Sequence, residues 1–230
     1  DDALVASKEL EITLTGKSCG LEERAPMCGI PYHAVEGYLS KLVSRGYKVA
    51  ICEQVEDPKL AKGLVKREVI RVVTPGTNLN VQSLEAGKNN YLLSIAYTPD
   101  GIGISAADVT TGDYYVTEVE DLKKLNDELM KYEPSEIICN EAFLVSGFDV
   151  NDLRSRLHIS VNALESHMFD DDGCRRILRK HFKVNTLIGL GVEEFPTGLL
   201  AAGALLQYLY DTQKTDLEHF THIYPYLTSK

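Results

Sequence analysis

A short stretch near the start of the chain has the residue types and spacing to bind a nucleotide phosphate. Gly16-Lys17-Ser18 matches the last three residues of a P-loop, in which backbone N–H groups surround the phosphates, Lys meets their charge and Ser or Thr holds Mg²⁺. The first glycine of such a loop would fall at position 11, where this sequence has Glu11. Because a carboxylate would repel a phosphate, we interpret residues 14–20 as a polar turn that follows a strand.

The cysteines and histidines do not form a recognisable metal or disulfide framework. The five cysteines are odd in number and irregularly spaced, with no C-x-x-C pair, so we expect free thiols and a reducing cytoplasm. His219 and His222 could face one way on a helix, but Pro225 follows closely and no carboxylate partner is evident. We therefore expect no bound metal and no cofactor in this chain.

The composition is that of a globular protein, and its charge is unevenly distributed. Of the 230 residues, 44% are hydrophobic and 25% are charged. No apolar run is long enough to span a membrane, and the start lacks a signal-peptide pattern and an initiator Met, so we expect a piece of a longer protein. The net charge of −10 falls almost wholly in residues 86–230. An acidic surface repels a phosphate backbone, so any nucleic-acid contact is expected from the nearly neutral first part.

Turn-forming residues divide the chain into two mixed α/β domains. We place a first domain at residues 1–75, a linker at 76–90 and a second domain at 91–215, with 216–230 as the start of a following segment. In the first domain, Val35, Leu39 and Val43 repeat at helical spacing. The elements that we expect there are helices at 2–9 and after residue 33, and strands at 11–15, 47–52 and 68–73.

The second domain opens with three strand patterns separated by tight turns, which predict an antiparallel meander. The strands are expected at residues 91–97, 103–108 and 114–119. The pattern continues with an amphipathic helix that ends before Pro134, a strand at 136–139, a helix at 174–182 and an apolar, small-residue helix at 197–210. Three strands, a helix, a strand and further helices are the order of an RNase H-like domain, by analogy at the level of the fold.

Two long motifs resemble the MutS family of DNA mismatch-repair proteins. They are residues 27–58, MCGIPYHAVEGYLSKLVSRGYKVAICEQVEDP, and residues 66–77, KREVIRVVTPGT. Residues 189–191, 201–208 and 211–213 look like the end of the family's second domain. The resemblance covers essentially the whole chain, in order and without large gaps.

The resemblance implies a concrete function. MutS proteins are dimers that clamp duplex DNA, with a first domain at the mismatch, a connector as second domain, and a distant ATPase domain that binds ATP and Mg. The connector also takes part in docking MutL. This chain would be an N-terminally truncated mismatch-recognition domain plus the connector, without catalysis of its own. The family's Phe-x-Glu wedge is absent from the sequence, so we expect no discrimination of mismatched from perfect duplex by this piece.

Six residues are candidates for DNA contact. Lys17 and Arg24 could meet phosphates, and Met27 could pack against sugars near a groove. Lys62, Lys66 and Arg67 form a second basic group. The alternative is a solvated loop for the first group and, for the second, lysines that protect an exposed strand edge.

Four further residues invite other interpretations. We expect His33 to help cap a helix with Glu36, Tyr32 to be a core or staple residue, and Cys52 to be a buried thiol. Asp108 could belong to a two-metal nuclease site with Glu136 and Asp149, although we interpret it as a turn-stabilising residue. An RNase H-like nuclease and a MutS-type clamp that acts in recombination stay as alternatives to mismatch repair.

Overall fold

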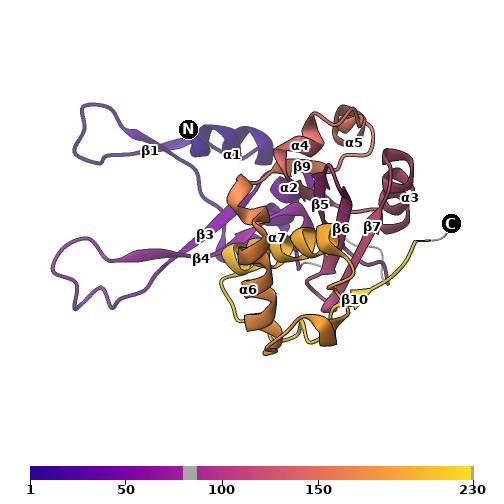
Figure 1. Cartoon of the computed structure of the whole chain (residues 1–230). Coiled ribbons are helices and arrows are strands. Elements are labelled where there is room, and N and C mark those ends of the chain that lie inside the picture. The colour runs from indigo at the N-terminus through magenta and orange to yellow at the C-terminus, as the bar shows by residue number, and fades with distance from the viewer. Residues whose placement is uncertain (80–86, 229–230) are drawn as a thin grey trace.

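The computed structural model describes residues 1–79 and 87–228, which form two lobes (Figure 1). The first lobe is residues 1–79 and the second is residues 87–228. Residues 80–86 of the expected linker lie outside the described residues. In the described part of the chain, no helix combines the length and the apolar character needed to cross a bilayer.

The first lobe consists of short helices and two separate two-stranded sheets. Its helix α2 packs Leu39 and Val43 against Val73, with Val49 and Ile51 partly buried beside them. This small cluster confirms the helical spacing seen in the sequence. The elements are α1 (Asp2–Leu10), β1 (Thr15–Lys17), β2 (Ala25–Met27), η1 (Tyr32–Ala34), α2 (Val35–Ser44), β3 (Val49–Gln54), β4 (Arg67–Val73) and η2 (Pro75–Thr77).

The expected strand at residues 11–15 is largely wrong. Helix α1 ends at Leu10 because Glu11 adopts a left-handed backbone conformation with φ 56°, and its N–H bonds back to the last turn. A left-handed residue is a common way to end a helix. The chain then continues without strand structure, and β1 begins only at Thr15.

The second lobe is a three-layer structure around a six-stranded sheet with the order β10-β7-β6-β5-β8-β9. Strands β5, β6 and β7 form the expected antiparallel meander, and β8 and β9 add in parallel beside β5. This arrangement confirms the RNase H-like expectation from the order of elements. The strands are β5 (Leu92–Thr98), β6 (Gly101–Asp108), β7 (Asp113–Val119), β8 (Glu136–Cys139), β9 (Ser160–Ala163) and β10 (Tyr224–Pro225).

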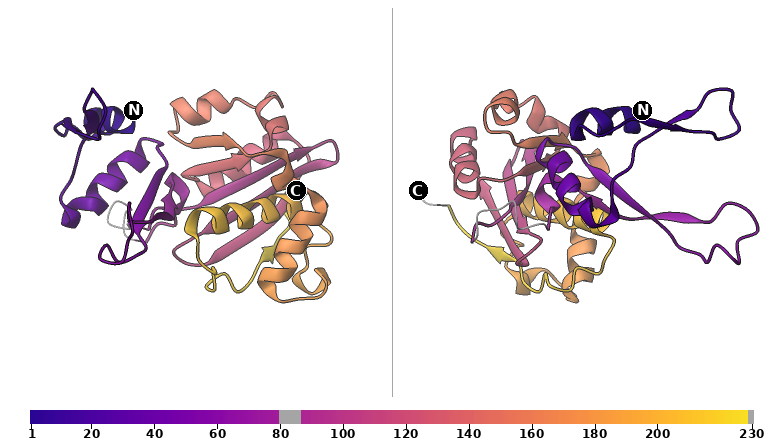
Figure 2. Two further views of the ribbon diagram at one scale, coloured as in Figure 1. Left: turned by 90° about the vertical axis from the view of Figure 1, so that its left-hand side faces the viewer. Right: turned by 180° about the vertical axis from the view of Figure 1, so that it is seen from behind.

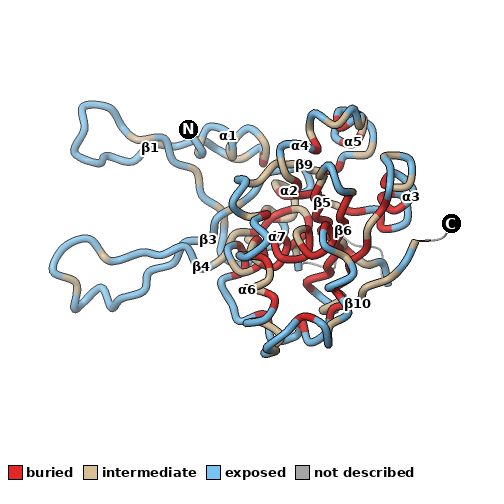
Figure 3. Tube along the Cα trace, viewed as in Figure 1, coloured by how far each residue is buried: buried red, intermediate tan, exposed pale blue. Residues whose placement is uncertain are grey.

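Helices cover both faces of this sheet, and almost all of the buried residues lie here (Figure 3). On one face, α3 (Leu122–Tyr132), α4 (Glu141–Leu144) and α5 (Val150–Ser155) pack against the sheet. On the other face lie α6 (Asp171–Phe182) and α7 (Pro196–Gln213). The remaining elements are the short helices η4 (Ser166–Phe169) and η5 (Ile188–Leu190).

Helix α7 is buried nearly all round because small residues let it approach its neighbours closely. A Cβ on Gly103 of β6 would lie 2.0 Å from the Thr197 carbonyl oxygen, and a Cβ on Gly203 would lie 2.3 Å from the Cys174 Cβ on α6. Real Cβ atoms do not approach that closely, so only glycine fits at these two crossings. The prediction of a buried, closely packed helix at 197–210 is confirmed.

The segment after α7 belongs to the second lobe rather than to a separate part of the chain. Leu217, Phe220 and Ile223 are buried in the core cluster on the α6–α7 face. Strand β10 then pairs in parallel with β7, with Tyr224 opposite Tyr115. The domain boundary expected at residue 215 therefore falls inside a packed unit, because the tail supplies core residues that a local pattern does not reveal.

Candidate nucleic-acid interface

Two β-hairpins project from the same side of the molecule (Figures 1 and 2). In the first hairpin, β1 and β2 pair antiparallel with Thr15 opposite Met27. In the second hairpin, β3 and β4 pair antiparallel, with a register shift between Ile51 and Cys52. The residues beyond the body of the molecule are nearly all exposed (Figure 3). A two-stranded ribbon is narrow enough to enter the major groove of DNA.

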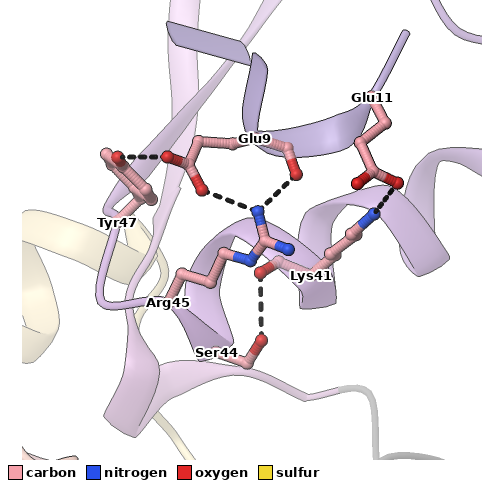
Figure 4. A network of polar contacts seen from close by, with 6 residues as sticks. All are labelled: Glu9, Glu11, Lys41, Ser44, Arg45 and Tyr47. Atoms are coloured by element: carbon pink, nitrogen blue, oxygen red, sulfur yellow. Dashed lines mark hydrogen bonds and ion pairs between the residues drawn. The ribbon is translucent and has the colours of Figure 1, made fainter. Parts of the chain in front are cut away.

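A polar network holds the base of the first hairpin to the rest of the first lobe (Figure 4). The Arg45 guanidinium, at the end of α2, donates to a Glu9 carboxylate oxygen at 2.6 Å, and the Tyr47 hydroxyl donates to the other at 3.2 Å. Lys41 and Glu11 form an ion pair at 3.8 Å. The hydrogen bond from Arg45 lowers the pKa of Glu9. Helix α1, from which the first hairpin emerges, is therefore fixed to α2.

The first three candidate residues lie together on the first hairpin. Lys17 ends β1, Met27 ends β2, and Arg24 directly precedes β2. The side chains of Lys17, Arg24 and Met27 are exposed. Arg24 donates to the Gly16 carbonyl across the hairpin, which leaves other guanidinium N–H groups free to meet a phosphate. The structure thus places these three residues on one projecting hairpin.

The hairpin also settles the interpretation of the Gly16-Lys17-Ser18 stretch. Gly16 pairs with Pro26 and Lys17 pairs with Ala25, so the backbone here is extended. A P-loop needs a compact turn whose N–H groups converge on one point before a helix. The match to a nucleotide site is therefore a coincidence of sequence.

The second group of candidates lies on the second hairpin. Arg67 begins β4, and Lys62 and Lys66 belong to the connecting loop at residues 55–66. Lys66 is already paired with Glu68 at 2.5 Å, and this contact raises the pKa of Lys66. Lys62 and Arg67 are exposed and make no ion pair within the described residues. They are the better placed members of this group for a phosphate.

The loop of the second hairpin carries two residues that the sequence analysis missed. Leu60 is 79% exposed and Leu64 is 96% exposed. Both lie among lysines, so the loop combines apolar side chains with positive charge. The signal available in the sequence was the pattern of Leu and Lys between two strands, which we interpreted only through its charges.

Three expectations about the first lobe are wrong. Tyr32 is 92% exposed and does not belong to the core. His33 lies in a short helix without any side-chain capping bond, and Ala34 is the N-cap of α2. Cys52 is exposed on β3. Each expectation assumed burial or capping from local position, whereas the first lobe has only a small core to bury such residues.

The three carboxylates of the nuclease alternative do not converge on one site, because each lies on a different element. Asp108 accepts hydrogen bonds from the Thr110 N–H at 2.8 Å and from the Asn90 N–H at 3.2 Å, which confirms its role in the turn. Glu136 lies on β8, with β5 between it and β6, and Asp149 caps α5 through the Asp152 N–H. Among the residues that the structure describes, no cluster of His, Cys, Asp or Glu could hold a metal ion. The geometry does not support hydrolysis by two metal ions.

The two histidines of the tail are likewise engaged separately. His219 bonds to the Val109 carbonyl at 2.7 Å, and His222 bonds to Thr221 at 2.8 Å. The segment that contains them is not helical, so the spacing expected on a helix does not apply. This pair is not arranged as a ligand pair.

Comparison with known families assigns each lobe. A family model described as MutS domain I matches residues 1–82, and a model described as MutS domain II matches residues 90–221. The chain belongs to the MutS family. The part that matches MutS domain I therefore carries both hairpins, and the match to MutS domain II covers the three-layer lobe apart from its ends, which include β10. The two matches also agree with the two mixed α/β domains expected from the sequence.

Curated relatives support the same assignment. The DNA mismatch repair protein MutS of Lachnoclostridium phytofermentans is 63% identical over 230 residues, which is 100% of this chain and 25% of the relative. The protein of the same name from Ruminiclostridium cellulolyticum is 48% identical over 95% of the chain, again 25% of the relative. That of Dehalococcoides mccartyi is 41% identical over 100% of the chain. The chain spans about a quarter of the length of these MutS proteins.

Proposed function

We propose that this part of a MutS protein binds duplex DNA through the two projecting hairpins of domain I. The observation that carries the proposal is the placement of the exposed Lys17, Lys62 and Arg67 on two ribbons that project from one side. Phosphate contacts by Lys and Arg supply affinity without reading sequence. Leu60 and Leu64 add apolar groups that suit the sugars and base edges inside a groove.

The second lobe would act as the connector of the longer protein. It would relay the state of a homodimeric clamp and take part in docking MutL, while ATP and Mg would bind elsewhere in the full-length protein. Residues 86–230 carry most of the net charge of −10, which disfavours contact between this lobe and a phosphate backbone. We propose that the chain itself is not an enzyme, and that the longer protein to which it belongs acts in the cytoplasm on mismatched duplex.

Fluorescence anisotropy with a labelled duplex tests the proposal. We expect weak binding that falls steeply with salt, and equal affinity for mispaired and perfect duplex. Replacing Lys62 and Arg67 together by Ala should lower the slope of log K against log salt by about 2, since each lost phosphate contact removes about 0.9. Lys123→Ala, an exposed charge on α3 of the connector, is the matched control and should leave the slope unchanged.

Three outcomes would contradict the proposal. The first is binding that does not depend on salt, and the second is a salt slope that changes with Lys123→Ala but not with the double substitution of Lys62 and Arg67. The third is a preference for the mispaired duplex by tenfold or more, which is about 1.4 kcal/mol. Tighter binding to a branched duplex than to a linear one would favour the recombination alternative. Cleavage of the duplex in the presence of Mn²⁺ that is abolished by Asp108→Asn would favour the nuclease alternative.

A further inference from the structure

The segment that leaves the second hairpin is buried against the connector. Thr74 and Thr77 are fully buried and bond to each other in a capping box around η2. A Cβ on Gly76, between them, would lie 2.9 Å from the Leu92 Cβ and 3.0 Å from the Glu136 Cβ. The backbone of this segment therefore lies directly on β5 and β8 of the connector, at a position that has no room for a larger residue.

The buried carboxylate of Glu136 connects this segment to helix α7. Glu136 is 0% exposed, and its Oε1 accepts the Gly76 N–H at 3.0 Å. Its Oε2 accepts the Tyr208 hydroxyl of α7 at 2.5 Å. Burial and the neighbouring Glu136 raise the pKa of Tyr208 well above its ordinary value, so the phenol stays protonated and donates. A buried carboxylate is tolerated only when such donors satisfy it.

Two cations of the second hairpin reach the same helix. Arg71 on β4 donates to the Gln213 side chain at 3.2 Å and to the Thr77 carbonyl at 2.7 Å. Lys48, directly before β3, places its ammonium 5.3 Å from the centre of the Tyr208 ring, within the range of a cation–π contact. The base of the second hairpin is thus attached to α7 at both of its strands.

We infer that Glu136 is a positioning residue that locks the base of the β3–β4 hairpin to the connector, so that hairpin and connector move as one rigid body. Its two acceptor oxygens join the exit of β4 to α7, and no other carboxylate among the described residues bonds to both. The functional meaning of this joint rests on the proposed DNA binding, because a fixed hairpin would pass on to the connector any movement that DNA imposes on it. The rigidity itself is a mechanical property that can be measured without DNA.

Distances between two spin labels, measured by pulsed electron resonance, test the inference. One label is placed at Glu53 on β3 and the other at Asp127 on α3, both of which are exposed. The accessible thiols of Cys19, Cys28 and Cys52 are first replaced by Ser. Cys139 and Cys174 can stay, because they are buried and burial raises the pKa of each thiol to about 12.

The doubly labelled chain is expected to give one narrow distance distribution. Glu136→Ala should broaden it at least about twofold, because domain motion is the default where an interface is not locked. In Glu136→Gln the distance distribution should stay narrow, since the amide oxygen still accepts the Gly76 N–H. Glu128→Ala is the matched control, because Glu128 is another buried carboxylate of the connector that accepts a Tyr hydroxyl, at 2.6 Å, but lies away from the joint. It should also stay narrow.

A second variant protects the test against a failure of Glu136→Ala to fold. Gly76→Ala keeps the Glu136 carboxylate but adds a methyl group that would lie too close to Leu92 and Glu136. This variant should therefore also broaden the distance distribution. The inference would be overturned by a broad distance distribution in the unsubstituted chain, or by a narrow one in both Glu136→Ala and Gly76→Ala. It would also be overturned by a broad distribution in Glu136→Gln or in Glu128→Ala. Failure of DNA binding would overturn the proposed function alone, because these distances are measured without DNA.

Discussion

At the scale of single residues, Glu9 decides how firmly the first hairpin is held. Its carboxylate accepts hydrogen bonds from Arg45 and Tyr47 at the junction of α1 and α2. The contact with Arg45 is the largest cause of its lowered pKa. A lowered folded-state pKa means that the stabilisation is present above the unfolded-state pKa and is lost as the pH falls through the folded-state value.

The corresponding prediction concerns Glu9→Gln. At neutral pH this variant should show faster amide hydrogen exchange in α1 than the unsubstituted chain, because the ion pair with Arg45 is gone. The difference should shrink as the pH falls from the ordinary carboxylate pKa of 4.5 through the lower folded-state pKa of Glu9, where the folded chain also takes up the proton. Exchange measured by mass spectrometry at several pH values checks this, after correction for the intrinsic rate. A difference that grows towards low pH would contradict the linkage.

The residue types indicated part of the candidate interface, but the ion pairs and the burial of each residue could not be predicted from the sequence. Lys17, Lys62 and Arg67 are exposed on the hairpins, as their charge suggested. The sequence did not reveal that Lys66 is paired with Glu68, because that contact depends on the register of the hairpin. Tyr32 looked like a core residue because apolar rings are usually covered, which requires a neighbouring surface that the first lobe does not provide.

At the scale of elements, the crossing of α6 and α7 depends on a glycine. A Cβ on Gly203 would lie 2.3 Å from the Cβ and 2.6 Å from the Cα of Cys174. Since the helix backbone would have to shift, we expect Gly203→Ala to lower the free energy of unfolding of the connector by about 1–3 kcal/mol. Urea denaturation followed by circular dichroism measures this change.

Gly37 on α2 provides a control with the opposite sign. No atom lies within 4 Å of a Cβ built on it, and it is exposed inside the helix. Gly37→Ala should therefore stabilise α2 by about 0.5–1 kcal/mol, through the better helix propensity of Ala. Equal effects of the two substitutions would show that helix propensity, and not the close crossing, determines the result.

Elements with strong local patterns were predictable, and elements that depend on distant partners were not. The meander of β5, β6 and β7 follows from alternating residues and tight turns, and α7 follows from its length and apolar character. Strand β10 has only two residues and exists because β7 accepts it, so no local pattern marks it. The end of α1 likewise depends on the left-handed conformation of Glu11, which its residue type does not demand.

At the scale of the whole molecule, the two lobes differ in how much core they contain. Of the four clusters of buried apolar residues within 1–79 and 87–228, the connector holds three and the first lobe holds one small cluster. Local opening is easiest where few apolar groups are buried. We therefore expect brief trypsin treatment of the native chain to cut first after Arg24, Lys59 or Lys62 in the hairpin loops, and to leave the connector whole.

Mass spectrometry of the early fragments identifies these cuts. The many exposed Lys and Arg residues of the connector, such as Arg176 and Lys180 on α6, serve as an internal control because they are equally basic but lie on a packed helix. First cuts within residues 87–228 would show that the connector opens more easily than the hairpins. That result would contradict the expectation that the first lobe, with its small core, opens locally more easily than the connector.

Strand β10 also has a consequence for behaviour at high concentration. Without it, the outer backbone groups of β7 around Tyr115 and Val116 would be open to a strand of another molecule, which is how sheets begin to aggregate. Tyr226 extends the protection by donating its N–H to the Val116 carbonyl at 3.0 Å. The tail therefore keeps the sheet from growing across molecular boundaries, and a chain shortened before residue 224 would be expected to self-associate.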